Sequence, residues 1–82
     1  MRRILKNPQK QEEIDMPDPD GNTWLIDASR DGNYNLVFLL LERGADPFAK
    51  NNANETPLGL AERGGFDDVA SLLRDFIEVL QD

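Results

Sequence analysis

The sequence has 82 residues, with 9 basic against 16 acidic side chains, a formal net charge of −7, and neither cysteine nor histidine. A single domain with a small core and no disulfides is therefore expected, and the commonest zinc ligands, the usual general base near neutral pH and histidine-activated nucleophiles are absent. An acidic chain repels nucleic-acid backbones and anionic lipids, so the charge favours a basic protein partner or serves solubility alone.

Residues 1–17 precede the regular part of the chain. They start with basic residues, but no apolar run is long enough for a signal peptide, and no later run approaches the length of a membrane span. We therefore expect a cytoplasmic protein that does not enter a membrane. We interpret residues 1–17 as a remnant N-terminal cap, in which Ile4 and Leu5 end a helix and Ile14 takes the position that Pro47 occupies later.

A shift of 33 residues aligns two parts of the chain. Positions 23–40 and 56–73 share seven identical residues out of eighteen, from Thr23 and Thr56 to Leu40 and Leu73. Ordinary amino-acid usage would give roughly one identity by chance. We therefore divide a single domain, residues 1–82, into the cap remnant, a first repeat at 18–50 and a second repeat at 51–82.

Each unit is predicted to form a pair of helices. The first helix begins after Thr23 or Thr56, which are good N-cap residues, and runs to Gly32 or Gly65. A second helix follows, with apolar residues at i, i+3 and i+4. In the first unit this helix ends at Arg43, Gly44 supplies a left-handed turn, and an Asn-rich connection continues to Glu55. Because residues 36–41 are all apolar, we expect this helix to be buried on several sides, in the middle of a stack.

The last helix is expected to continue to about Leu80, because Ile77 and Glu78 replace the turn that Gly44 and Ala45 make in the first unit. Asp67 and Asp68 lie in its first turn, where carboxylates favour the helix dipole. Its predicted core stripe consists of Val69, Leu72, Leu73, Phe76 and Leu80. Ile77 and Val79 lie off that stripe, which is consistent with a C-terminal cap, a self-association face or an exposed partner site.

The units resemble the ankyrin repeat over residues 14–75. Its Thr-Pro-Leu-His-x-Ala opening is matched by residues 56–61 and more loosely by 23–28, its Asp-x-x-Gly-x-Thr finger by 18–23, and its Leu-Leu-x-x-Gly-Ala-Asp motif by the stretch from Leu39 to Asp46. The motif histidine is replaced by Ile26 and Gly59, so the hydrogen bonding that it usually provides between repeats is missing. In the second finger, Asn51 and Asn54 replace Asp and Gly, and asparagine tolerates the left-handed conformation.

This resemblance implies an all-α stack of helix hairpins that binds a partner protein, with no catalytic, cofactor-binding or metal-binding residues. In ankyrin-like arrays the finger tips and the inner face of the first helices form a concave binding surface. Carried over position by position, the candidate residues are Pro19, Asp20, Asn22, Asp27, Arg30, Asp31, Asn52, Ala53, Glu55, Leu60, Arg63 and Gly64, with Trp24, Phe48 and Lys50 beside them.

Several residues in this set allow two interpretations. Arg30 and Arg63 hold equivalent positions, so they either bind carboxylates on a partner or pair with Asp27, Asp31 or Glu62 within the surface. Trp24 and Phe48 are candidate anchors for a partner. For Trp24, packing against the N-terminal remnant is the alternative.

The leading functional hypothesis is a non-enzymatic protein-binding module that acts as an adaptor, inhibitor or immunity-type partner. One alternative is a self-associating structural unit that forms a homo-oligomer through Ile77, Val79 and the terminal helix. The other is an acidic mimic that occupies a nucleic-acid-binding groove of its partner, without contacting nucleic acid itself. The segment 18–22 is similar to the start of a calcium loop, but its glycine offset is wrong and the required Glu is missing.

Overall fold

The computed structural model describes residues 14–81, which include four helices. These are α2 (Trp24–Asp31), α3 (Tyr34–Glu42), α4 (Pro57–Arg63) and α5 (Asp67–Gln81). No strand occurs within that range, so the predicted all-α class is confirmed. Ile4 and Leu5, on which the interpretation of a cap remnant depended, lie outside the described residues.

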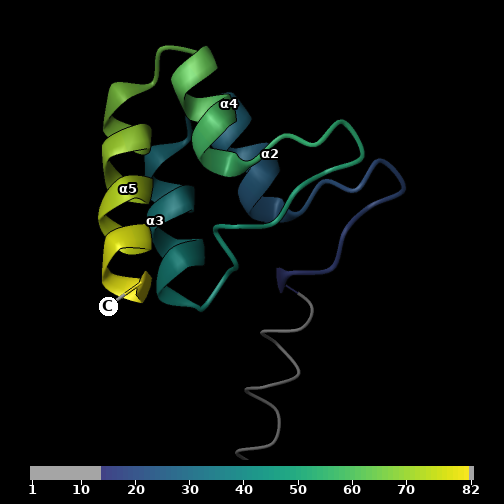
Figure 1. The fold of residues 1–82 in the computed structure, drawn as a ribbon, viewed down its shortest axis with the longest axis horizontal. Coiled ribbons are helices and arrows are strands. Elements are labelled where there is room, and N and C mark those ends of the chain that lie inside the picture. The colour runs from purple at the N-terminus through teal and green to yellow at the C-terminus, as the bar shows by residue number, and fades with distance from the viewer. Residues whose placement is uncertain (1–13, 82) are drawn as a thin grey trace, which may run out of the picture.

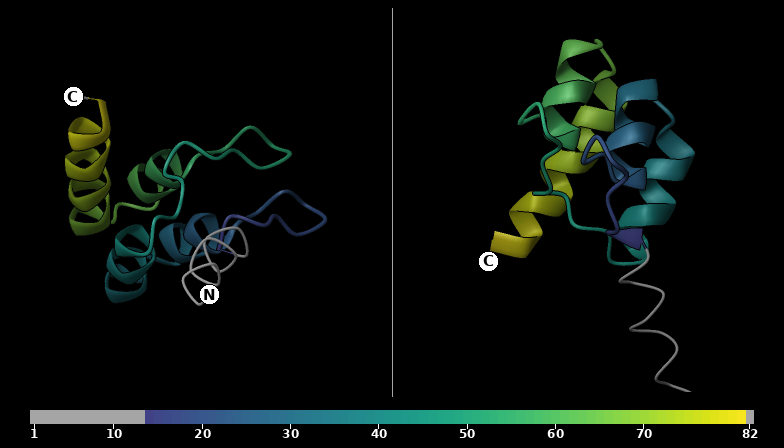
Figure 2. Two further views of the ribbon diagram at one scale, coloured as in Figure 1. Left: turned by 90° about the horizontal axis from the view of Figure 1, so that it is seen from below. Right: turned by 90° about the vertical axis from the view of Figure 1, so that its right-hand side faces the viewer.

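The helices form two hairpins that stack side by side (Figure 1). α2 contacts α3 and α4 contacts α5 within the hairpins, while α2 contacts α4 and α3 contacts α5 between them. Figure 2 shows the two hairpins as successive layers, with a long loop projecting from the inner helix of each. Because α2 and α4 begin at positions 24 and 57, and α3 and α5 at 34 and 67, the 33-residue period of the sequence is also the period of the structure.

The helices begin and end at the residues that local chemistry favours. The hydroxyl oxygens of Thr23 and Thr56 accept hydrogen bonds from the backbone N–H groups of Ile26 and Gly59, at 3.3 and 3.1 Å. These bonds satisfy donors that the first helical turn leaves free. Gly32 caps α2 at a φ of 72°, and Gly44 follows α3 at a φ of 93°, in the left-handed region that favours glycine. The predicted N-caps and the Gly44 turn are therefore confirmed.

A core of apolar side chains from all four helices fills the space between the hairpins. Ile14, just before the first finger, is buried with them, as is Pro47 at the equivalent position of the next unit. The backbone N–H of Asp46 also donates to Asp15 Oδ1 at 2.8 Å, which ties the residue after Ile14 to the loop before Pro47. The core members are Ile14, Leu25, Ala28, Val37, Leu40, Leu41, Ala45, Ala61, Val69, Ala70 and Leu73.

The second helix of the first unit differs from the prediction, because α3 is buried on one side only. Val37, Leu40 and Leu41 face the core, whereas Leu36 and Leu39 are 39% and 44% exposed. The apolar run from 36 to 41 places hydrophobic residues around the whole helix, but among the described helices its main packing partners are α2 and α5. α3 therefore lies at an end of the described stack and not in its middle.

The last helix reaches Gln81, close to its predicted end, and carries Asp67 and Asp68 in its first turn as expected. Its predicted stripe is correct for Val69 and Leu73, which are fully buried, and for Leu72 and Phe76, which pack against the core. The prediction is wrong for Leu80, whose side chain is 58% exposed, and the neighbouring Val79 is 71% exposed. Figure 2 shows the last turns of α5 diverging from α3, so α3 does not cover them. Among residues 14–81, no helix combines the length and the apolar character that a membrane crossing requires.

Candidate functional site

The two long loops, called fingers here and comprising residues 18–22 and 51–55, close with the same hydrogen bonds. Asp18 Oδ1 accepts from the backbone N–H groups of Asp20 and Asn22, both at 2.9 Å. Asn51 Oδ1 accepts from those of Ala53 and Glu55, at 3.0 and 2.9 Å. Gly21 and Asn54 take the left-handed position, at φ values of 83° and 67°. The expectation that asparagine can replace glycine in this turn is therefore confirmed.

The fingers are bonded to each other as well as closed on themselves. Asn51 Nδ2 donates to Asn22 Oδ1 and to Glu55 Oε1, both at 2.8 Å. An aspartate, the usual residue of the family motif at this position, has no donor for either bond. Asn52 donates through its backbone N–H to Asp20 O at 3.0 Å and through Nδ2 to Pro19 O at 3.1 Å. The two fingers therefore form one connected loop surface, which the sequence motif alone did not reveal.

We call the exposed side chains of the fingers and inner helices the finger surface. Most of the predicted residues are exposed on it, namely Pro19, Asp20, Trp24, Arg30, Asp31, Lys50, Asn52 and Arg63. Three others are half-buried: Asn22, Asp27 and Glu55. Leu60 is only 5% exposed and so leaves the candidate set, because α4 turns it into the protein. Asn22 accepts the bond from Asn51, so its amide is already partly used in holding the fingers together.

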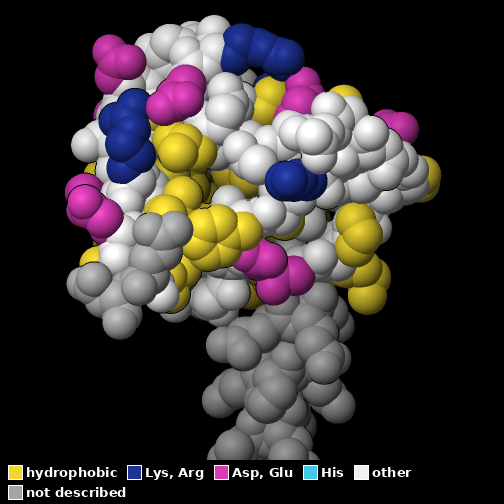
Figure 3. Space-filling model, in the orientation of Figure 1, with side chains coloured by type: hydrophobic (Ala, Val, Ile, Leu, Met, Phe, Trp, Pro, Cys, Tyr) yellow, Lys and Arg dark blue, Asp and Glu magenta, His cyan; other side chains and the backbone are white. Residues whose placement is uncertain are grey.

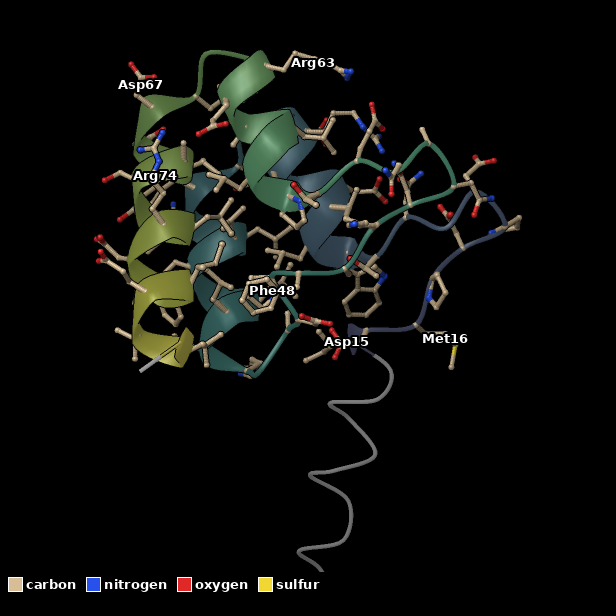
Figure 4. All side chains as sticks on the ribbon, viewed as in Figure 1. Asp15, Met16, Phe48, Arg63, Asp67 and Arg74 are labelled. Atoms are coloured by element: carbon tan, nitrogen blue, oxygen red, sulfur yellow. The ribbon has the colours of Figure 1, made fainter. Side chains whose placement is uncertain are left out.

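The two repeat-related arginines both bind acids within the surface. Arg30 Nη2 lies 3.1 Å from Asp27 Oδ1, one helical turn earlier. Arg63 donates through both terminal nitrogens to Glu55 Oε2, at 2.7 and 3.1 Å, and not to the expected neighbour Glu62. Figure 4 shows Arg63 at the outer edge of α4. Because these pairs are exposed, they orient the side chains more than they stabilise the fold.

The two candidate anchors lie in different places. Trp24 is 59% exposed at the start of α2 and lines a shallow pocket with Met16, Pro17 and Asp27. Phe48 is 48% exposed and lies in the loop that leaves α3, facing the last turns of α5 (Figure 4). It lines an open groove with Leu41, Phe76, Val79 and Leu80, and Figure 3 shows apolar side chains gathered there. Phe48 therefore belongs to this groove and not to the finger tips.

The similarity of the first finger to a calcium loop does not extend to its geometry. The carboxylate oxygen Asp18 Oδ1 already accepts two backbone N–H bonds, so it organises the turn. Within residues 14–81, no group of three or more acidic side chains is placed to hold a metal ion.

Comparisons with known proteins support the resemblance. A family model described as ankyrin repeats (many copies) matches residues 9–61. The potassium channel AKT1 of Oryza sativa subsp. indica is 46% identical over 55 residues, or 67% of this chain. A homologue of the transient receptor potential cation channel subfamily A member 1 from Caenorhabditis elegans is 39% identical over 72 residues, or 85% of this chain. The chain spans about 6% of the length of each of these curated relatives.

Proposed function

Because this chain belongs to the ankyrin repeat family, whose members generally mediate protein–protein interaction, we propose that it is a non-enzymatic module that binds a partner protein through the finger surface. Such a module serves as an adaptor, an inhibitor or an immunity-type partner, according to what it binds. We place its action in the cytoplasm, because a chain without cysteine does not depend on the disulfides that form in oxidising compartments.

The observation that carries the proposal is the network that joins the fingers. Asn51 and Asn52 together supply four hydrogen bonds from the second finger to the first finger or to Glu55. A loop that is ordered before binding loses less conformational entropy when a partner arrives, so its affinity benefits. Meanwhile the side chains at the tips, such as Asp20 and Ala53, are exposed and form no part of the core.

The charges on this surface favour a partner with basic side chains. Arg30 and Arg63 neutralise Asp27 and Glu55. The remaining charged residues of the finger surface are two acids, Asp20 and Asp31, and one base, Lys50, so the surface carries a net negative charge. Residues 18–82 hold 13 acids and 5 bases, a net charge of −8, so the wider field has the same sign. Long-range attraction of this kind mainly accelerates association with an oppositely charged protein.

Site-specific photocrosslinking in the native host tests the location of the surface. A photoreactive residue at Ala53, at the exposed tip of the second finger, is compared with one at Ser71, exposed on α5. We expect a covalent adduct with one protein from position 53 and none from position 71. Equal adducts from both positions, or adducts that a nuclease removes, would contradict the proposal.

Once the partner is identified, a pair of charge reversals tests its chemistry. Asp20→Lys and Asp75→Lys change the net charge equally, but only Asp20 lies on the finger surface. We expect Asp20→Lys to weaken binding on the order of tenfold and Asp75→Lys to change it little, measured by titration calorimetry. If the two variants bind equally, the charge of the finger tip has no part in recognition.

A further inference from the structure

The two ends of the stack have opposite chemistry. Ile26, Ser29 and Leu41 are buried in the first unit, yet the repeat places Gly59, Glu62 and Arg74 at the same positions of the second unit, where all three are exposed. Arg74 Nη2 binds Glu62 Oε2 at 2.9 Å, so an ion pair joins α4 and α5 at this end (Figure 4). The C-terminal end of the stack is therefore closed by polar side chains.

The opposite end carries apolar side chains where a buried interface would be expected. Pro57, Val69 and Leu72 are buried or half-buried in the second unit, whose helices pack on α2 and α3. The repeat equivalents of these residues in the first unit are Trp24, Leu36 and Leu39, all of which are exposed. We call these three residues the end face. Their positions in the unit are those that bury the second hairpin against the first.

We propose that the end face joins two copies of this chain head to head. The end face continues the internal interface between the hairpins, and every residue from 34 to 41 is uncharged although the chain carries a net charge of −7. A second copy can therefore approach this side of α3 without bringing like charges together, and Asp27, which lies beside Trp24, is paired with Arg30.

The alternative head-to-tail arrangement is unfavourable, because it would cover the exposed pair of Glu62 and Arg74 with apolar side chains. Desolvating an ion pair costs more than its attraction returns unless its hydrogen bonds are all satisfied. A head-to-head contact uses the same patch on both copies and closes after two chains. It also increases the apolar burial of a small domain, for which association is a common source of stability.

Sedimentation of the full chain over a range of concentrations tests this contact. We expect a monomer–dimer equilibrium that strengthens with added salt, since salt screens the repulsion between two acidic chains. Trp24 is the only tryptophan, so its fluorescence reports the end face directly. Its emission should move to shorter wavelength as the dimer forms. A chain that stays monomeric at every concentration, with unchanged Trp24 emission, would overturn the proposal.

A matched set of exposed substitutions locates the interface. The double variant Leu36→Gln, Leu39→Gln should weaken dimerisation on the order of tenfold or more, because it removes apolar contacts from both copies. Val79→Gln changes an even more exposed residue on α5 and should leave the dimer intact. Circular dichroism of each variant checks that it is folded. If Val79→Gln dissociates the dimer and the double variant does not, copies meet through the terminal helix and the proposal is wrong.

Discussion

The two units have the same sequence motif and the same arrangement of helices, but they differ in what surrounds them. Leu36 is exposed while its equivalent Val69 is fully buried, and Ser29 is fully buried while its equivalent Glu62 is exposed. The reason is position in the stack, because among residues 14–81 each unit has a neighbouring unit on one side only. In this chain the repeat determines which way a side chain points, and the neighbouring unit determines whether anything covers it.

The largest expected effect is the difference in stability loss between substitutions at Val69 and at its equivalent, Leu36. Val69→Asn removes a fully buried side chain and introduces an amide without partners, so we expect a loss of about 3 kcal/mol in the free energy of unfolding. Leu36→Asn should cost less than about 1 kcal/mol, most of it helix propensity. Urea unfolding at the lowest usable protein concentration measures both without a contribution from self-association. Similar losses for the two variants would mean that α3 is covered on its outer side.

A smaller effect distinguishes the fingers. Asn51→Asp removes both side-chain N–H bonds and places a carboxylate beside Glu55, so we expect a loss of about 1–2 kcal/mol. The reverse change at the equivalent position, Asp18→Asn, keeps the accepting oxygen and should stay within about 0.5 kcal/mol. Thermal unfolding measures both. Equal effects would show that the bonds between the fingers contribute nothing to stability.

The smallest effect concerns Ser29, whose buried hydroxyl has no hydrogen-bond partner among the described residues. Ser29→Ala should be neutral or stabilise the fold by up to about 1 kcal/mol, because it removes an unsatisfied group and favours the helix. Glu62→Ala, at the equivalent exposed position, loses only the pair with Arg74 and should change stability by less than about 0.5 kcal/mol. A clear loss for Ser29→Ala in chemical denaturation would point to a partner for its hydroxyl.

The candidate surface was predictable in outline and less so in detail. The motif identified which loops form the fingers, and the exposed tips at Asp20 and Asn52 lie where it placed them. It included Leu60, which is buried, and it grouped Phe48 with the fingers although Phe48 lines the groove beside α5. Both differences depend on how neighbouring helices pack, which a motif does not contain.

The sequence by itself determined the period of 33 residues, the N-caps at Thr23 and Thr56 and the left-handed turns at Gly44 and Asn54. Each of these depends on chemistry within a few residues of the chain, namely a hydroxyl beside a free N–H or a residue that tolerates positive φ. Only the tertiary structure decided which apolar residues are covered and which polar residues pair. Burial and pairing depend on contacts between helices that lie far apart in sequence. The apolar run from Leu36 to Leu41 is therefore compatible with an α3 buried on one side or on all sides, and only the packing of the neighbouring helices distinguishes the two.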